Sequence, residues 1–395
     1  MFVYADNAAT TKMSPTAIKA MTEAMETVWG NPSSLHTTGQ TAKEALENAR
    51  GTIASLLGAE PREIYFTSGG SEADNQAILS AAINGAKKNK KHIISTAFEH
   101  HAVLHTLKKL EKQGYEIELL DVHENGIVTA EQVRGAIRPD TALVTVMYAN
   151  NEIGTIQPIR EIGAVCREMG VPFHTDAVQA VGHIPVNVKE DNIDMLSVSA
   201  HKFHGPKGIG VLYAKRGTIL SNVIEGGAQE RGKRAGTENM PAIVAMAAAM
   251  KEAVETMDAV NAKIIPMREK LIEGLEKIPH SKLNGDRNSR VPGTVNFCFE
   301  GIEGESLLLM LDEEGIEASS GSACTSGSLD PSHVLLALGM PHEVAHGSLR
   351  LSICENNTDE EIDHILRVVP EVVSYLRNMS PVWEALESGE KPHLI

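Results

Sequence analysis

The amino-acid sequence predicts an α/β fold with a large, mostly parallel sheet and a second, smaller α/β domain. Between about residues 60 and 215, short apolar segments alternate with helical patterns, which is typical of a parallel sheet covered on both faces. Polar motifs follow several of these segments, at the strand ends where parallel sheets bind ligands. After residue 260 the pattern changes, and this change predicts the second domain.

Apolar runs and helical periodicity place the elements of the large domain in order. The predicted strands are 63–67, 92–96, 116–121, 142–148, 171–175, 194–199 and 209–213. The predicted helices between them are 71–86, 101–113, 130–136 and 159–169.

The remaining elements predict the small domain. They are a long helix over 258–279, strands near 293–299 and 348–353, a helix at 304–314 and a final helix over 359–378. The tail 380–395 is expected to be irregular. We therefore expect a large domain at 13–258, and a small domain formed by 1–12 and 259–395.

Composition excludes several classes of protein. The 395 residues are 42% hydrophobic, which indicates a globular chain. A net charge of −16 argues against nucleic acid as a partner, because phosphate binding needs a basic face. The longest apolar stretch, 240–250, is too short to span a membrane, and the N-terminus has no secretion signal. The four cysteines form no Cys-x-x-Cys pair, so the sequence indicates neither a zinc site nor a thioredoxin-type motif. A disulfide framework is not expected in a chain of this size, and we therefore expect a reducing, cytoplasmic location.

Lys202 is the most informative residue of the chain. It lies in the run SAHKFHGPKG at 199–208, between two histidines and directly after an apolar strand. Lysine amines become nucleophiles when burial and cationic neighbours lower their pKa. The commonest carbonyl cofactor for such a lysine is pyridoxal phosphate, bound as a Schiff base. The alternative is a surface cluster of lysine and histidine in a loop.

Two further segments supply what this cofactor needs. Asp176 ends the apolar segment 171–175, where its carboxylate can pair with the pyridinium nitrogen, although an Asp there also caps turns. Gly70 and Ser71 lie in a Gly-rich turn between a predicted strand and a helix N-terminus, which favours an anion such as phosphate. The turn has neither a Walker motif nor a dinucleotide fingerprint, and by itself it is also consistent with a tight connection.

Cys324 lies in the segment ASSGSACTSGS at 318–328, which consists almost entirely of small residues. Such a segment cannot form a core, so we expect a mobile loop at about 318–330 with Cys324 available as a nucleophile. An incidental loop thiol is the alternative. The other cysteines, Cys166, Cys298 and Cys354, lie in apolar surroundings typical of buried, inert thiols.

Taken together, the chain resembles the pyridoxal-phosphate cysteine desulfurases of the NifS/IscS type. The resemblance extends over nearly the whole chain, from DNAATT at 6–11 to SLRLS at 348–352. Matching segments between these ends are NPSSLH at 31–36, TSGGSE at 67–72, EH at 99–100, NNEIG at 150–154, the lysine run and RAGT at 234–237. The length of the Cys324 loop resembles the group that transfers sulfur to a scaffold protein. The resemblance implies the type I fold of pyridoxal-phosphate transferases and a homodimer with active sites at the interface.

The resemblance also implies residue roles. Gln179 is expected to bond the ring oxygen of the cofactor, and His100 to stack on the ring and assist proton transfer. The phosphate is expected to be held by Gly70, Ser71, Ser199 and His201, with Thr237 from the other subunit. Asn151 is expected to contact the cofactor and, with Arg350, the carboxylate of L-cysteine, because a guanidinium suits a bidentate pair. Cys324 would attack the substrate sulfur, release L-alanine and retain a persulfide; a transient role as an iron–sulfur ligand is a weaker expectation.

Other functions remain open at this point. A selenocysteine lyase is the main alternative, whereas an aminotransferase has no use for Cys324. A cysteine hydrolase would need no cofactor, and a non-catalytic relative would be expected to lack Lys202, Asp176 or Cys324. The expected role is sulfur supply for iron–sulfur clusters, a nitrogenase cofactor or other thio-products, and the sequence does not identify the acceptor.

Overall fold

A seven-stranded sheet forms the centre of the computed structural model, which describes residues 1–320 and 330–395. Its strand order is β2-β8-β7-β6-β5-β3-β4. The strands are β2 (Ile64–Thr67), β3 (His92–Thr96), β4 (Glu116–Leu120), β5 (Thr141–Thr145), β6 (Phe173–Asp176), β7 (Met195–Ser199) and β8 (Gly210–Ala214). β8 pairs antiparallel with both β2 and β7, and the other neighbours are parallel. The predicted α/β class and mostly parallel sheet are therefore confirmed.

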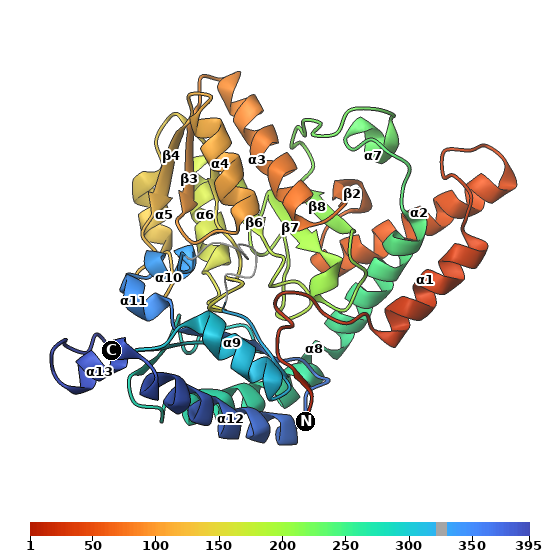
Figure 1. Ribbon diagram of the computed structural model, residues 1–395. Helices are drawn as coiled ribbons and strands as arrows, with labels where there is room; N and C mark the ends of the chain where they lie inside the picture. Colours follow the sequence, from red (N-terminus) through yellow and green to blue (C-terminus); the bar gives the residue numbers. More distant parts are fainter. Residues whose placement is uncertain (321–329) are drawn as a thin grey trace.

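Helices cover both faces of this sheet (Figure 1). Adjacent strand residues such as Ile93 and Ile94 belong to different cores, because successive side chains of a strand point to opposite faces. One face packs on α3 (Gly70–Ala86) and α4 (His101–Glu111). The other packs on α2 (Thr37–Leu57), α5 (Ala130–Ala136), α6 (Ile159–Met169) and the first part of α8 (Met240–Leu275).

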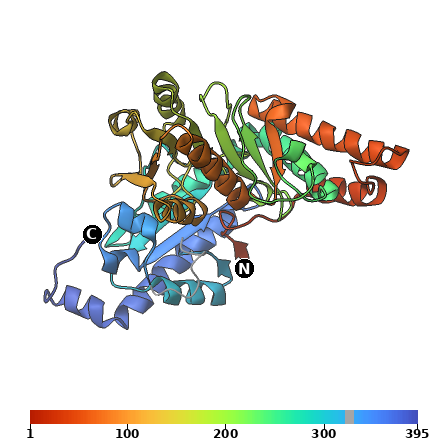
Figure 2. The same ribbon diagram turned by 90° about the horizontal axis from the view of Figure 1, so that it is seen from above.

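A separate core lies near both termini (Figure 2). It contains the second half of α8, α9 (Gly304–Glu313), α12 (Asp359–Asn378) and a three-stranded antiparallel sheet in the order β12-β10-β9. These strands are β9 (Ser281–Leu283), β10 (Thr294–Phe299) and β12 (Ser348–Ser352). The N-terminal β1 (Val3–Tyr4) joins it by pairing with β11 (Ile316–Glu317). The division into two domains stays a prediction.

Shorter elements complete the chain. They are α1 (Pro15–Thr27), η1 (Pro61–Glu63), η2 (Ala200–Lys202), α7 (Gln229–Gly232), α10 (His333–Ala337), α11 (His342–Ala345) and α13 (Pro381–Glu387). Helices α1 and α2 were not assigned from the sequence. In the part of the chain that the structure describes, no helix is both long and apolar enough to cross a membrane.

The structure corrects two expectations about helices. The helix expected at 258–279 begins at Met240 instead, because the Ala- and Met-rich segment before residue 258 is itself strongly helix-forming. The tail 380–395, expected to be irregular, contains α13, which starts at a Ser380 side chain that accepts a hydrogen bond from the Trp383 N–H.

Candidate active site

Lys202 lies in η2, directly after the carboxyl end of β7. Its amine donates hydrogen bonds to the carbonyl oxygens of Ala8 at 2.6 Å and Ala9 at 2.8 Å. The Gln179 side-chain amide donates to the same Ala8 oxygen at 3.0 Å. Residues 5–12, here called the N-terminal strap, thus bring two backbone acceptors to Lys202. Gln179 lies beside the lysine because both side chains donate to the Ala8 oxygen.

Asp176 ends β6, the strand next to β7, and is only 5% exposed. Burial raises the pKa of this carboxyl to about 6. Two interactions oppose the rise: the Val178 N–H donates to Asp176 Oδ1 at 3.0 Å, and the charge of Lys202 favours the ionised form. Asp176 and Lys202 therefore occupy the carboxyl ends of adjacent parallel strands and interact electrostatically.

Sequence reasoning did not single out Asp74 and His174, two buried groups near Asp176. Asp74, on α3, is buried, and the charge of Asp176 adds to the burial that raises its pKa well above the usual range. His174 Nε2 lies 3.6 Å from Asp74 Oδ1 and 3.0 Å from the Ser197 hydroxyl. Burial lowers the pKa of His174 to about 3, so this ring is neutral at physiological pH. The signal available in the sequence was the position of Asp74 one turn into a helix that follows the Gly-rich turn.

The N-terminus of α3 lies beside the end of β7. The helix begins at Gly70 after Gly69, and no side chain caps it. A Cβ built on Gly69 would lie 3.7 Å from Ser199 Oγ, and one built on Gly70 would lie 2.7 Å from Val178 Cγ2. These contacts bring the Gly-Gly turn, Ser199 and the segment after Asp176 together. The first-turn N–H groups of an uncapped helix suit an anion, and the side chain of Ser71, in this turn, is exposed.

Two histidines of the site are held in the neutral form. Burial and then the charge of Lys202 lower the pKa of His100 to about 4 and that of His201 to about 4. His100 caps α4, and its Nδ1 accepts the Ala102 N–H at 3.1 Å, so we assign the hydrogen of the neutral ring to Nε2. His201 Nδ1 lies 3.1 Å from the Thr10 hydroxyl.

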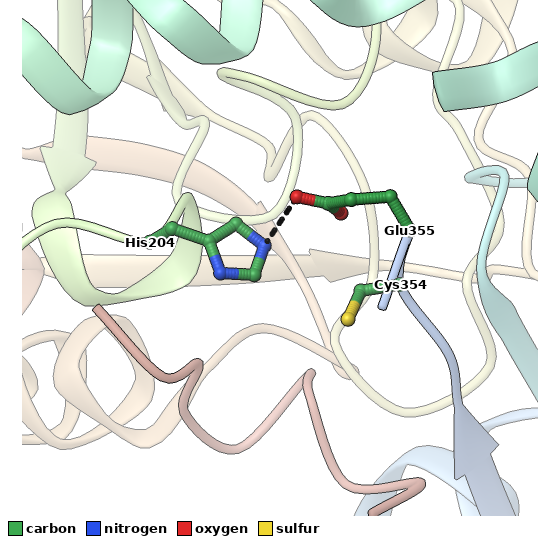
Figure 3. Close-up of side chains that lie close together, drawn as sticks. All are labelled: His204, Cys354 and Glu355. Atoms are coloured by element: carbon green, nitrogen blue, oxygen red, sulfur yellow. Dashed lines mark ion pairs between the residues drawn. The ribbon is translucent and has the colours of Figure 1, made fainter. Parts of the chain in front are cut away.

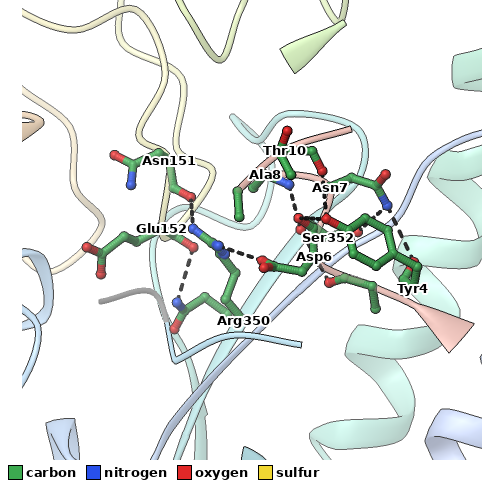
Figure 4. A network of polar contacts seen from close by, with 12 residues as sticks. Tyr4, Asp6, Asn7, Ala8, Thr10, Asn151, Glu152, Arg350 and Ser352 are labelled. Carbon is green, nitrogen blue, oxygen red and sulfur yellow. Dashed lines mark hydrogen bonds and ion pairs between the residues drawn. The ribbon is translucent and has the colours of Figure 1, made fainter. Parts of the chain in front are cut away.

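Arg350 forms a buried polar network from β12 (Figure 4). Its Nη2 donates to Asp6 Oδ1 at 2.7 Å and its Nη1 to the carbonyl oxygen of Asn151 at 2.9 Å. Arg350 Nε has no hydrogen-bond partner among the described residues, which leaves a buried donor available to a ligand. Asn151 contributes its carbonyl, while its side-chain amide points away from Arg350 in Figure 4. Asp6 is a further site residue that the sequence did not single out.

Glu99 and Glu152 are two further buried carboxyl groups, and sequence reasoning assigned neither of them a role in the site. Burial raises the pKa of Glu99 to about 8. Its Oε1 accepts from the Thr96 hydroxyl and the Met147 N–H. Glu152 accepts a short hydrogen bond from the Ser332 hydroxyl, and burial raises its pKa. Both follow strands of the large sheet, which was the signal that they lie at the site edge.

Thr237 is exposed, between α7 and α8, and the Arg234 side chain of the same segment pairs with Glu72 in the first turn of α3, Nε to Oε1, at 2.9 Å. Cys324 and most of its expected loop lie outside the described residues. The cysteines expected to be inert are buried, and burial raises the pKa of Cys166 to about 12, Cys298 to about 12 and Cys354 to about 11.

Residues 3–365 match the family Aminotransferase class-V. The chain belongs to this family. Two relatives named cysteine desulfurase IscS are each 53% identical to it: one from Clostridium botulinum over 385 residues, covering 97% of both chains, and one from Methanosarcina thermophila over 380 residues, covering 96% of this chain and 94% of the relative.

Solved structures agree with the family assignment. A NifS-like protein superposes with a TM-score of 0.89 at 37% identity, covering 95% of this chain and all of its own. A structure described as SspA in complex with cysteine gives 0.78 at 36% identity, covering 89% and 98%. The type I fold expected from the sequence is confirmed by these neighbours.

The described residues of this class-V protein fit pyridoxal phosphate, the cofactor of its family. Lys202 would hold the aldehyde, buried Asp176 would face the ring nitrogen, and the uncapped start of α3 with Ser199 and His201 would receive the phosphate. A Cβ on Gly70 would collide with Val178, so the absence of a side chain keeps this turn open.

Proposed function

We propose that the protein is a pyridoxal-phosphate-dependent cysteine desulfurase that converts L-cysteine to L-alanine and retains the sulfur as a persulfide on Cys324. The observation that carries the proposal is the placement of the Lys202 amine and the buried Asp176 carboxyl at the ends of adjacent strands. The names of the relatives support cysteine as substrate, and they favour it over selenocysteine.

The chemistry of the cofactor is that of an electron sink, which stabilises the negative charge left when a bond to the substrate breaks. Asp176 favours this by keeping the ring nitrogen protonated, and for this it must itself be ionised. Its raised pKa of about 6 lies below neutral pH, and a pyridinium partner would lower it further.

We propose that Lys202 moves a proton of the substrate. With the cofactor and the substrate bound, the Lys202 amine would be the group that takes the α-proton of the substrate. The Ala8 and Ala9 carbonyls that accept hydrogen bonds from it fix the position of the amine. His100, neutral with a hydrogen on Nε2, presents a donor at the same site.

The contacts of Arg350 support a role in binding the substrate carboxylate. Its unpartnered Nε offers one donor at once, and a second follows if the carboxylate replaces Asp6 on Nη2. Asn151, whose carbonyl holds Nη1, fixes the guanidinium from the opposite side. On this ground we propose Arg350 as the substrate-carboxylate site, with Asn151 positioning its guanidinium through the backbone carbonyl. A direct contact of the Asn151 side chain with the carboxylate or the cofactor is proposed from the resemblance alone.

The finer partners are proposals that rest on the resemblance. We propose a homodimer in which Thr237 of one subunit completes the phosphate site of the other, and an iron–sulfur scaffold or another acceptor that takes sulfur from Cys324. A reducing cytoplasm is the proposed location, and a transient iron contact of Cys324 stays a prediction.

The decisive experiment compares the wild type with Cys324→Ala. With free L-cysteine and a reductant, we expect the wild type to release alanine and sulfide in equal amounts. The variant should lose both, by a factor of about 100 or more, while keeping its bound cofactor and yellow colour, because Lys202 and Asp176 are intact. Cys166→Ala, which changes a buried cysteine away from the site, is the control.

Alanine release that persists in Cys324→Ala would contradict persulfide chemistry and indicate direct elimination, as in a lyase. A colourless wild-type protein that binds no pyridoxal phosphate would instead contradict the whole proposal and favour a cofactor-free cysteine enzyme.

A further inference from the structure

Three potential metal ligands, His204, Cys354 and Glu355, come together in the structure (Figure 3). His204 follows η2, two residues after Lys202, whereas Cys354 and Glu355 follow β12, the strand that carries Arg350. One ligand atom from each side chain lies within 4.8 Å of the other two. The cluster therefore joins two distant segments through an imidazole, a thiol and a carboxylate.

The separation of two of these atoms matches a tetrahedral metal site. His204 Nε2 and Glu355 Oε1 are 3.4 Å apart. Bonds of about 2.0–2.1 Å from zinc to nitrogen and oxygen, at tetrahedral angles, put such ligands roughly 3.4 Å apart. The Cys354 sulfur needs to be roughly 3.6 Å from each, because its bond to zinc is about 2.3 Å. In the structure without an ion, the sulfur lies within 4.8 Å of both atoms.

The histidine is also oriented as a metal ligand would be. His204 Nδ1 lies 2.8 Å from the carbonyl oxygen of Lys12, so this nitrogen carries a hydrogen and donates it. A metal-bound histidine usually donates its other ring N–H in this way, which fixes the tautomer and the ring direction. The backbone of His204 is held too, because its N–H donates to Thr11 Oγ1 at 2.8 Å and its carbonyl accepts from the Ser14 N–H at 3.0 Å.

Space for an ion and a water molecule lies beside the cluster. His204, Cys354 and Glu355 line a cavity of about 60 Å³, together with the carboxylate-bearing Glu252. The side chain of His204 is 12% exposed and that of Glu355 is 39% exposed, so an ion can enter from solvent.

We propose that His204, Cys354 and Glu355 bind one divalent cation of the zinc class per chain, with water in the fourth position. A thiolate with an imidazole and a carboxylate selects a borderline-soft metal in tetrahedral geometry over magnesium or calcium. The thiol and the imidazole each give up to solvent any proton on the ligating atom as the metal binds. The site is separate from the Lys202 centre and does not depend on the proposed desulfurase activity.

A bound ion would connect the segment after Lys202 to the end of β12. These are the segments that position the proposed cofactor lysine and the proposed substrate arginine, so the ion would fix their relative placement. Without an ion, His204 and Glu355 form the ion pair seen in Figure 3.

A second histidine cluster fits a metal less well. His280, Glu300 and His393 also bring ligand atoms within 4.8 Å of one another. However, the rings of His280 and His393 are stacked, with centroids 3.6 Å apart and an interplanar angle of 14°. Nitrogen lone pairs lie in the ring planes, so stacked rings direct them side by side and not toward one ion.

Zinc and cobalt(II) titrations of the holoenzyme test the proposal. The Cys324→Ala background removes the competing thiol, and metal is first removed with a chelator. We expect one Zn²⁺ per chain by equilibrium dialysis, and Co²⁺ should give the intense visible bands of tetrahedral cobalt, which Zn²⁺ displaces. Adding Cys354→Ser should weaken Zn²⁺ binding at least tenfold and abolish the cobalt bands. Cys166→Ser and His393→Ala are the matched controls and should change neither.

His204→Asn provides a second test in case Cys354→Ser does not fold, since Asn tolerates the positive φ of 62° at this position. It should also weaken binding at least tenfold. Failure of the background protein to bind Zn²⁺, or binding that none of these substitutions at 204 and 354 weakens, would overturn the proposal and leave only an ion pair. Loss of binding in His393→Ala would assign the metal to the other cluster and overturn it equally.

Discussion

At the scale of single residues, burial sets the charge of the site. Removal from water lowers the pKa of His100 to about 4 and raises that of Glu99 to about 8, so both groups are mostly neutral at pH 7. Asp176, with a pKa of about 6, ionises at a lower pH than Glu99. Asp176 is thus mostly ionised at pH 7, as its proposed role beside the ring nitrogen requires.

Glu99→Gln tests this at one residue. The folded-state pKa of Glu99 lies near 8 and its unfolded value near 4.3, so the folded chain binds the extra proton between these values. The free energy of unfolding of the wild type should therefore fall as the pH rises through this window, by up to about 1.4 kcal/mol per pH unit from this group. Gln has no such proton, so the variant should gain stability relative to the wild type from pH 5 to 8.

Chemical unfolding at several pH values measures this difference. Glu111→Gln, an exposed position at the end of α4, is the control and should follow the wild type. Parallel pH profiles for Glu99→Gln and the wild type would show that Glu99 titrates normally in the folded protein.

At the scale of elements, a buried ion pair holds the segment that leads to Thr237. Arg50 on α2 pairs with Glu230 in α7 through two hydrogen bonds of 2.8 Å, and their side chains are 3% and 2% exposed. Glu230 also accepts the Phe66 N–H of β2 at 2.8 Å. Glu230 has a positive φ of 47°, so these contacts offset an unfavourable backbone conformation. The pair joins α2, β2 and the start of the loop that carries Arg234 and Thr237.

Removing one partner of this pair should be costly. Glu230→Gln leaves the Arg50 charge buried without its carboxylate, and we expect a loss of about 3–5 kcal/mol in the free energy of unfolding, measured in urea. Arg50 also contacts Glu47, but that side chain is 52% exposed, so Glu47→Gln should cost less than about 1 kcal/mol. Equal losses for the two variants would mean that the pair at Glu230 contributes no more than a surface contact.

At the scale of the whole molecule, two cores meet along α8 and the N-terminal strap. Met240 to Met250 of α8 pack under the large sheet, and Ile264 to Leu275 pack in the second core. The loop between α1 and α2 presents Leu35 and Trp29, which are 94% and 73% exposed in the single chain. Large apolar side chains exposed together are typical of an interface, which supports the proposed homodimer.

Leu35→Glu tests the dimer. A charge at this position should oppose burial against a second subunit, so we expect the mass from light scattering to shift from dimer toward monomer. Activity should fall with it if Thr237 acts across the interface. Leu309→Glu is the control, because Leu309 is 70% exposed on α9, away from this loop. A dimer that survives Leu35→Glu but dissociates in Leu309→Glu would move the interface to α9.

The sequence by itself predicted the order of strands and helices from β2 to β8, and it predicted that Asp176 and Lys202 follow strands of the large sheet. Period-2 and period-3.6 patterns are local, so β3, α5, α6 and α12 were predicted with the bounds that the structure has. The strand-end position of Asp176 and Lys202 follows from the same patterns, because parallel strands end at one edge. The start of α8 and helix α13 were misjudged, since helix length depends on what each face packs against.

Only the tertiary structure decided which distant groups meet. Asp6 reaches Arg350 across 344 positions of the chain, and Ala8 accepts the Lys202 amine across 194. Asp74 lies behind Asp176, and His204 lies beside Cys354 and Glu355. No local pattern encodes such contacts, because they arise when packed layers bring separate segments together. The raised and lowered pKa values follow from the same packing, since desolvation depends on the neighbours that folding supplies.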